Sequence, residues 1–470
     1  MTPDVCVVGG GSAGLVVAAG AAQLGLGVVL VERAEMGGDC LNYGCVPSKA
    51  LIAAAKAAQA QRSGGAFGIA PVEPRVDFGR VMDHVAQVIA AIATNDSVER
   101  FERLGVRVLK EEARFVGRTE LVAGPHRIRS RRIVLATGSR PTAPPIPGLA
   151  DVPYFTNETI FANRTLPSHL IVIGGGPIGL EMAQAFRRLG ARITVLEAVD
   201  FLAKDDAELS AIVVTQLRAE GVELRAPARI ARVERASAGM AVILEDGERL
   251  EGSHVLVAAG RAPIVEALDL ETAGIAHTTR GITVDASLRT SNRHVWAIGD
   301  CNGLYPFTHM AGYEASLFIR GALFRAPARL DTAIVPWATY TDPELAQVGL
   351  GERAAREKHG DAIKVLRWKM AENDRAQTER ETVGMVKAIT DRRGRILGAA
   401  IVAPQAGELI QPWCLAIAQR LRISALASFV PPYPTLGEAS KRAAGSYFTD
   451  TLFGPRTRGL VRFLARLPVW

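Results

Sequence analysis

The sequence predicts an α/β protein with two copies of one strand–helix–strand unit, followed by an α+β domain at the C-terminus. Residues 4–32 and 169–197 align without a gap at an offset of 165. Each is an apolar run, a G-x-G-x-x-G turn, a helix-like stretch and a second apolar run that ends in glutamate. After Asp331 the pattern changes to alternating runs and helices, which favours a separate domain.

The glycine turns indicate what the two repeats bind. In a dinucleotide-binding unit the first glycine makes the turn, the second lets the backbone approach a pyrophosphate, and the third packs helix on strand. The N–H groups at the helix start favour an anion. Both repeats therefore predict Rossmann-like dinucleotide-binding domains, and Glu32 and Glu197 are candidates for binding ribose hydroxyls. Ordinary glycine turns and solvated strand-end charges are the alternatives. The glycines are Gly9, Gly11 and Gly14, then Gly174, Gly176 and Gly179.

Composition excludes several classes of protein. Hydrophobic residues make up 48% of the 470 residues and charged residues 22%, so the chain is globular and not disordered. The net charge of +7 comes without a long basic run, so we expect no nucleic acid partner. No apolar stretch reaches the roughly 18 residues of a transmembrane helix. The N-terminus shows no signal-peptide pattern, and we expect a cytoplasmic location.

The repeats and the pattern change give a predicted domain order. Residues 1–148 form the first nucleotide domain, 149–265 the second, 266–332 return to the first, and 333–470 form the C-terminal domain. Residues 48–62 and 78–104 are predicted helices, and 106–135 short strands. The segments IVLATGSRP (133–141) and VLVAAGRAP (255–263) resemble each other, which again suggests duplication.

Two cysteines stand close together in GGDCLNYGCVPSKA (37–50). Zinc sites favour closer pairs and usually need a second pair, which this chain lacks. Cys45 is followed by Val46-Pro47-Ser48, which opens a helix, and a helix N-terminus stabilises a thiolate. Cys40 and Cys45 therefore suggest a redox-active disulfide; two reduced core cysteines are the alternative.

The chain resembles the class I pyridine nucleotide–disulfide oxidoreductases over residues 3–450. The motifs are the two glycine turns, C-L-N-x-G-C-x-P-S-K, A-T-G-S-x-P and the A-x-G-D of 297–300. The resemblance implies that the first nucleotide domain binds FAD, the second binds NAD(P)H, and the C-terminal domain forms a homodimer whose active site is shared across the interface. It further implies that Cys45 is the thiolate beside the flavin and Cys40 the thiol that attacks a small-molecule substrate.

The resemblance also assigns further site residues. Lys49 would stabilise the reduced flavin and Glu181 would pair with it, although both could form a purely structural ion pair. Asp300 would bind the ribityl chain, and Ala113 and Ser139 would offer backbone contacts to FAD. The remaining cofactor positions are Ser12, Ala13, Arg33, Gly38, Asp39, Thr137, Gly138, Gly260 and Thr308. Because Glu197 repels a 2′-phosphate and Ala198-Val199 follow it, the residues favour NADH over NADPH.

The chain departs from the disulfide-reducing members near its end. Those members carry His-Pro-Thr and then Glu; here Tyr433 stands at the histidine position, while Glu438 is present. A free tyrosine has a pKa of about 10, against about 6.5 for histidine, so Tyr433 is expected to be a poor general base near neutrality. Mercuric reductases also carry tyrosine here, but they add a C-terminal cysteine pair that this chain lacks.

The substrate therefore stays open between a disulfide, a metal ion, a quinone and a small oxidant. A flavoprotein that binds its nucleotides without turnover is a further alternative. The tail from Phe453 is a basic amphipathic stretch. Its expected role is packing on the chain's own dimer; contact with a membrane surface and a partner site are the alternatives. Its basic residues are Arg456, Arg458, Arg462 and Arg466, and its apolar residues are Leu460, Val461, Phe463, Leu464, Leu467 and Trp470.

Overall fold

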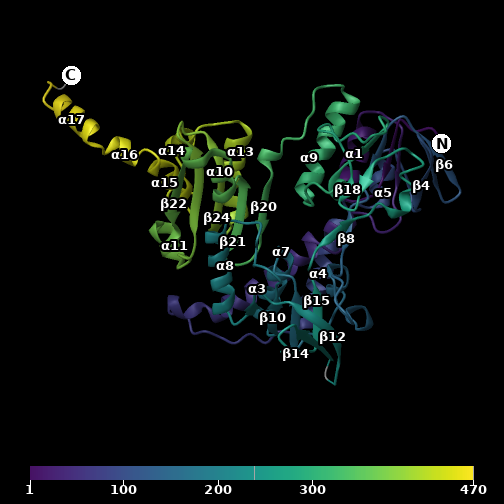
Figure 1. The fold of residues 1–470 in the computed structure, drawn as a ribbon, viewed down its shortest axis with the longest axis horizontal. Helices are drawn as coiled ribbons and strands as arrows, with labels where there is room; N and C mark the ends of the chain where they lie inside the picture. Colours follow the sequence, from purple (N-terminus) through teal and green to yellow (C-terminus); the bar gives the residue numbers. More distant parts are fainter. Residues whose placement is uncertain (238, 469–470) are drawn as a thin grey trace. The chain divides into compact units, whose positions relative to one another are not determined.

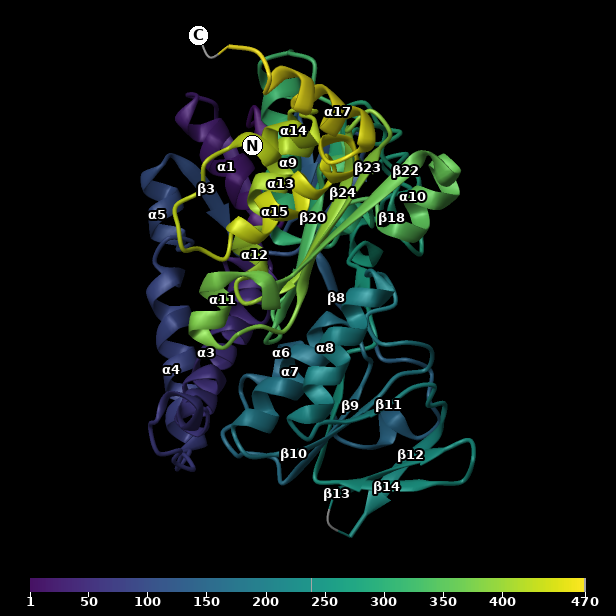
Figure 2. The same cartoon turned by 90° about the vertical axis from the view of Figure 1, so that its left-hand side faces the viewer.

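The computed structural model describes residues 1–237 and 239–468, which fall into two compact units. The first unit contains residues 1–198 and 222–330; the second contains residues 199–221 and the chain from Asp331 onward. Figures 1 and 2 trace the elements of both units. Among the described residues, no helix has the length and apolar character that crossing a bilayer demands.

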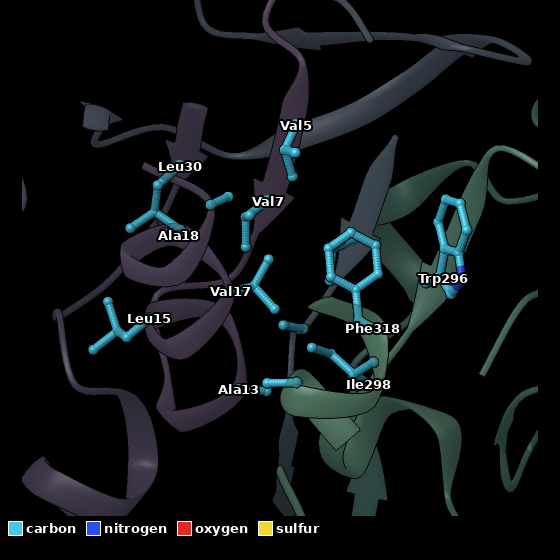
Figure 3. Packing of buried hydrophobic residues seen from close by; sticks show 14 of the residues in the cluster. Val5, Val7, Ala13, Leu15, Val17, Ala18, Leu30, Trp296, Ile298 and Phe318 are labelled. Atoms are coloured by element: carbon cyan, nitrogen blue, oxygen red, sulfur yellow. The ribbon is translucent and has the colours of Figure 1, made fainter. Parts of the chain in front are cut away.

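A five-stranded parallel sheet, in the order β19-β7-β1-β2-β3, organises the first nucleotide-binding part of unit one. Its side chains alternate between the faces, as strand geometry requires. Val7 packs in a cluster with Trp296 and Phe318, whose ring centroids lie 5.2 Å apart (Figure 3). Cys6 packs on the opposite face, in a cluster with a small antiparallel sheet. The elements are β1 (Val5–Val8), β2 (Val28–Val31), β3 (Val106–Leu109), β7 (Ile133–Leu135) and β19 (Val295–Ala297), helices α1 (Ser12–Gln23) and α9 (Thr308–Phe318), and the small sheet β4 (Ala113–Gly117), β5 (Glu120–Ala123) and β6 (His126–Arg129).

The second repeat folds as a parallel sheet in the order β11-β10-β9-β15. Helix α7 (Pro177–Arg188) lies at the predicted offset of 165 from α1, residue for residue at both ends. The two nucleotide-binding domains of the predicted fold class are thus confirmed. The strands are β9 (His169–Ile173), β10 (Arg192–Leu196), β11 (Glu223–Arg225) and β15 (His254–Val257), beside an antiparallel sheet of β12 (Ile230–Ala236), β13 (Gly239–Leu244) and β14 (Arg249–Gly252).

Between the repeats lie the helices that carry the cysteine pair. These are α2 (Gly38–Asn42), α3 (Cys45–Arg62), α4 (Phe78–Ala93) and α5 (Val98–Arg103). Helix α3 begins at Cys45, three residues before the predicted start. The predicted helix over 78–104 is wrong as one element, because the chain breaks after Ala93 and Ser97 caps a new helix by accepting the N–H of Arg100. Shorter elements are β8 (Ser139–Pro141), α6 (Asn157–Ile160), β16 (Arg261–Pro263), β17 (His277–Thr278) and β18 (Gly281–Ile282).

Unit two is an antiparallel five-stranded sheet with helices packed against it, in the order β20-β21-β24-β23-β22. Trp413 is fully buried in its core, and its indole N–H donates to Ser440 Oγ at 3.0 Å. The strands are β20 (Pro336–Thr339), β21 (Glu344–Gly349), β22 (Ile363–Lys369), β23 (Met385–Asp391) and β24 (Ile396–Ala403). The helices are α8 (Ala207–Ala219), α10 (Glu352–His359), α11 (Asp374–Glu379), α12 (Ala406–Leu409), α13 (Gln411–Ala418), α14 (Ile423–Ser428), α15 (Glu438–Ser446), α16 (Thr449–Leu452) and α17 (Pro455–Leu464).

Helix α8 belongs to unit two, although its residues fall inside the predicted second nucleotide domain. A buried ion cluster explains this difference. Lys387 Nζ on β23 lies 2.8 Å from Asp206 Oδ2 and 2.9 Å from Glu208 Oε2, both at the start of α8. Burial lowers the pKa of Lys387, but its hydrogen bonds to Asp206, Glu352 and Glu208 together outweigh this effect. The pKa is therefore raised, and the ammonium stays charged.

Candidate active site

The first and third glycines of each turn are required by the surrounding backbone. Gly9 and Gly174 have φ of +110° and +115°, and a Cβ on either would lie 2.2 Å or 2.5 Å from a carbonyl oxygen. A Cβ on Gly14 or Gly179 would lie 1.9 Å or 2.0 Å from the carbonyl oxygen of the first glycine. A side chain at Gly14 or Gly179 would push the helix away from its strand, and one at Gly9 or Gly174 would clash with the backbone that follows the neighbouring strand β7 or β15.

The second glycine of each turn has no such neighbour. A Cβ on Gly11 would meet nothing nearer than 3.7 Å, and a Cβ on Gly176 would meet nothing within 4 Å. Each residue is the N-cap of its helix, and neither helix has a side-chain cap. The space beside each turn and the first N–H groups of α1 and α7 therefore fit a phosphate group.

Glu32 and Glu197 hold the two turns in the same way. Glu32 Oε2 accepts the N–H of Gly10 at 2.5 Å, and Glu197 Oε2 accepts the N–H of Gly175 at 2.7 Å. Each carboxylate thus ends its strand directly beside the turn of its own repeat. A hollow in the first nucleotide-binding domain is lined by the first glycine turn, by Glu32 and by residues far from them in the sequence. Among the residues that line it are Gly9, Glu32, Arg33, Ala113 and Thr137.

The cysteine pair lies at the start of two consecutive helices. Cys40 is on α2 and Cys45 is the first residue of α3; both are free thiols, and Cys45 is the more exposed. Cys45 Sγ lies 3.3 Å from Thr308 Oγ1 at the start of α9. Cys40, Cys45 and Thr308 come from α2, α3 and α9, so three helices of unit one meet at the two thiols.

The two thiols differ in acidity. The hydrogen bond from Cys40 lowers the pKa of Cys45 to about 6, assisted by Thr308 and the charge of Lys49, and opposed by burial and the charge of Asp39. The same hydrogen bond, with burial and the charge of Cys45, raises the pKa of Cys40. Cys45 therefore loses its proton first, and Cys40 keeps its proton as the donor to the Cys45 thiolate.

Lys49 and Glu181 form an ion pair between α3 and α7. Lys49 Nζ lies 2.7 Å from Glu181 Oε2, and the glutamate side chain is only 6% exposed. Lys49 is one helical turn after Cys45, so its charge also favours the Cys45 thiolate. This ion pair links α3, the helix that begins at Cys45, to α7 of the second nucleotide-binding domain.

Arg261 links the cysteine segment to the carboxylate at the end of β19. Its guanidinium lies 3.1 Å from Asp39 Oδ1 and donates to Asn157 Oδ1 at 3.3 Å. It also donates to Ser139 Oγ at 2.8 Å, and Ser139 Oγ in turn donates to Asp300 Oδ2 at 2.6 Å. Burial raises the pKa of Asp300, while Ser139 and Arg261 oppose the rise. The Arg261 guanidinium therefore holds Asp39, the residue before Cys40, directly, and it reaches Asp300 through Ser139.

Glu314 on α9 supports the turn that carries Asp300. Its Oε2 accepts the N–H of Gly299 at 2.7 Å and an N–H of Asn302 at 2.8 Å. Its Oε1 is buried and has no hydrogen-bond partner among the residues that the structure describes. Burial raises the pKa of Glu314 to about 7, against the two hydrogen bonds. The carboxyl therefore holds a proton more readily than a free glutamate does.

Tyr433 and Glu438 belong to unit two. Tyr433 is 70% exposed, and its O–H donates to Asp374 Oδ2 at 2.8 Å. This hydrogen bond and the charges of Asp374 and Glu438 raise the pKa of the phenol, so even less phenolate is present near neutrality than for a free tyrosine. Glu438 opens α15 and accepts from Arg442 at 2.9 Å.

Comparison with known proteins decides the family. Residues 3–315 match the model of the pyridine nucleotide-disulphide oxidoreductases, and residues 335–444 match the dimerisation domain of the same family. The chain belongs to the pyridine nucleotide-disulfide oxidoreductases. This confirms the predicted family and fold class, including the α+β dimerisation domain. The oxidoreductase family depends on FAD and takes its electrons from NAD(P)H, and the dimerisation domain supports a homodimer.

Individual relatives of this oxidoreductase span almost its whole length. It is 34% identical to a mercuric reductase of Streptomyces lividans, over 95% of the chain and 96% of that protein. It is 36% identical to dihydrolipoyl dehydrogenase 3 of Pseudomonas aeruginosa, over 94% and 97%. Among solved structures, the Cu(II) complex of the HOCl-induced flavoprotein disulfide reductase RclA from Escherichia coli matches with a TM-score of 0.85 and 28% identity, over 93% and 98%. LpdA from Mycobacterium tuberculosis matches with a TM-score of 0.87 and 27% identity, over 94% and 99%.

The structure adds two site residues that the sequence analysis missed, Arg261 and Glu314. Arg261 follows Gly260 in the segment that resembles 133–141, so a cation directly after a glycine at a strand end was a usable signal. Glu314 gave no such signal, because an acid in a helical stretch is usually solvated. The structure brings Cys40, Cys45, Lys49, Glu181 and Thr308 together in unit one; their catalytic roles stay predictions.

Proposed function

We propose that this oxidoreductase passes electrons from NADH through FAD to the Cys40–Cys45 pair, and that Cys40 delivers them to a small-molecule substrate. The observation that carries the proposal is the unequal acidity of the two thiols: Cys45 is held as a thiolate by Cys40, Thr308 and Lys49, while Cys40 keeps its proton. FAD, when bound, supplies the two-electron relay between nicotinamide and disulfide. The open space beside Gly11 and the uncapped start of α1 support its binding in the first domain.

The residues around the pair have separate tasks in this proposal. Two electrons and one proton convert the disulfide into the Cys45 thiolate and the Cys40 thiol. Lys49 stabilises negative charge beside Cys45, and Glu181 holds Lys49 in place. When the substrate is a disulfide, Cys40 gives up its proton as it attacks one sulfur, and the departing thiolate takes that proton and leaves as a thiol, with a mixed disulfide formed on Cys40. The Cys45 thiolate then attacks Cys40, restores the intramolecular disulfide and releases the second half as a thiolate, which takes a proton from solvent.

We also propose that the active site is shared between the subunits of the dimer, with Tyr433 and Glu438 of one subunit closing the pocket over Cys40 of the other. Their register within the dimerisation domain supports this placement. Cofactor binding by the remaining predicted residues, including Ser12, Ala13, Gly38, Gly138 and Asp300, is part of the same proposal. A flavoprotein without turnover is not favoured, because the cysteine pair and the Lys49–Glu181 ion pair are both in place. The acceptor stays open between a disulfide, a metal ion, a quinone and a small oxidant.

An NADH-oxidation screen tests the proposed function. Purified enzyme would be offered a disulfide, a metal ion, a quinone and a small oxidant, with wild type compared to Cys40→Ser. We expect NADH oxidation with the physiological class of acceptor to depend on Cys40. Equal rates of wild type and Cys40→Ser with every acceptor would contradict a role for the cysteine pair.

Replacing Glu197 with arginine is expected to shift the cofactor preference towards NADPH. Wild type should favour NADH in kcat/KM, because a carboxylate accepts from the ribose 2′-OH and repels a 2′-phosphate. Glu197→Arg should change the NADH/NADPH ratio at least tenfold, which corresponds to about 1.4 kcal/mol. Glu245→Arg, an equal charge change at an exposed position of the same domain, should leave the ratio unchanged. A wild-type ratio close to one would refute the assignment.

Replacing Arg261 with methionine is expected to raise the pKa of Cys45. The charge of Asp39 raises this pKa, and Arg261 is the cation that pairs with Asp39. We expect the midpoint of Cys45 alkylation by iodoacetamide, measured against pH in the reduced protein, to rise by about 1 unit. Arg140→Met provides the control, since Arg140 pairs with Glu266 at the surface. An unmoved midpoint in Arg261→Met would show that Arg261 only supports the fold.

A further inference from the structure

Helix α17 presents an apolar stripe that the described chain does not cover. Leu460, Phe463 and Leu464 recur at i, i+3 and i+4, which places them on one side of the helix. They are 56%, 62% and 50% exposed, and no residue of the helix is buried. Leu467, in the turn that follows, continues the stripe at i+7. Figure 1 shows α17 extending from the rest of unit two (the yellow end of the chain). Trp470 lies outside the described residues.

A basic stripe accompanies the apolar one. Arg458 and Arg462 are four residues apart in α17, so they share one side of the helix. Arg456 lies at the start of the helix, and Arg466 lies in the turn that follows it. No acidic residue occurs after Asp450, and the four arginines account for four of the seven net positive charges of the chain. With no acidic side chain between Asp450 and Trp470, an anionic partner is what these arginines fit.

We propose that α17 docks on an anionic lipid surface, with its apolar stripe in the acyl boundary and its arginines among the headgroups. A lipid surface offers negative charge and an apolar layer side by side, parallel to the helix axis. Arginine stems are long enough to cover apolar surface while the guanidinium reaches the headgroups. A second copy of α17 fits less well, because it would place arginines against arginines and brings no acidic side chain to pair with them. The attachment is peripheral and does not depend on the redox chemistry proposed above.

Co-sedimentation of the full-length protein with vesicles tests the proposal. The vesicles would be phosphatidylcholine mixed with anionic phosphatidylglycerol, and phosphatidylcholine alone. We expect binding to the anionic vesicles that weakens as salt rises. Neutralising Arg458, Arg462 and Arg466 with glutamine should lower the partition constant about fivefold for each arginine, on the order of a hundredfold together. Replacing Leu460, Phe463 and Leu464 with serine should abolish binding.

A matched control separates the tail from net charge. A variant with Arg353→Gln, Lys358→Gln and Arg393→Gln loses three positive charges from exposed positions elsewhere in unit two, and should bind like wild type. Failure of wild type to bind anionic vesicles would overturn the proposal. If wild type does not bind lipid and the serine variant loses the dimer that wild type forms, helix α17 packs against a second copy of the chain instead. Equal loss of binding in the control variant would also overturn it, by showing that overall charge is responsible.

Discussion

Cys45→Ser is expected to abolish turnover of a disulfide substrate and to remove the long-wavelength absorbance that a thiolate gives beside oxidised flavin. The variant should still bind FAD, because no contact of the glycine turns involves Cys45. Dye reduction that bypasses the cysteines should partly survive. The measurement is the visible spectrum of the half-reduced enzyme together with NADH-dependent turnover. Survival of the long-wavelength band would move the thiolate role to another cysteine.

Changes at Cys40 give the matching control and a pH signature. Cys40→Ser and Cys40→Ala should also abolish disulfide turnover, yet both keep the Cys45 thiolate and its absorbance. That absorbance is present above the pKa of Cys45 and is lost as pH falls through it. Since the hydrogen bond from Cys40 is the largest cause that lowers this pKa, its loss in Cys40→Ala should move the transition to higher pH. Cys40→Ser keeps an O–H donor and should move it less.

Tyr433→His is expected to raise disulfide reduction by roughly 10²- to 10⁴-fold, the usual contribution of general acid–base catalysis. The hydrogen bond to Asp374 raises the pKa of Tyr433, so the phenol stays protonated across the neutral range and cannot take a proton from a thiol. An imidazole titrates near neutrality and can relay that proton. The measurement is kcat/KM for a lipoamide-type disulfide as a function of pH, in which the variant should show a new transition near neutrality.

Tyr433→Phe is the matched control for this argument. It removes the hydroxyl without adding a titrating group, so it should add no transition to the pH profile. A lowered rate with one substrate would assign Tyr433 to orienting that substrate. If wild type already reduces the disulfide as fast as a histidine-bearing relative, the argument from the missing base is wrong, and Glu438 or a water must carry the proton.

The parts of the fold that depend on local periodicity were predictable from sequence. The repeat offset of 165 placed α1 and α7 in register, and the first and third glycines of each turn follow from a backbone that leaves no room for a side chain. The candidate site was predictable where a motif carries its residues close together, as for Cys40, Cys45 and Lys49. These residues lie within ten positions of one another on the consecutive short helix α2 and helix α3, so local structure places all three.

Features that depend on distant contacts were not predictable. Arg261 gains its importance from Asp39 and Ser139, which are more than a hundred residues away. Glu314 is distinguished only by its burial. The break after Ala93, by contrast, had a local signal that was overlooked: residues 94–97 are Thr-Asn-Asp-Ser, and Ser97 caps the new helix.

The ion cluster around Lys387 joins two parts of the chain that the ribosome makes at different times. Asp206 and Lys387 are separated by 181 residues. At about 5–20 residues per second, helix α8 is made roughly 10–40 s before the strand that carries Lys387. Throughout that interval Leu209, Val213 and Leu217 have no sheet to cover them, although all three are buried in the finished protein. We therefore expect the nascent chain to expose the apolar side of α8 during this interval, and exposed apolar surface of this kind favours aggregation or chaperone binding.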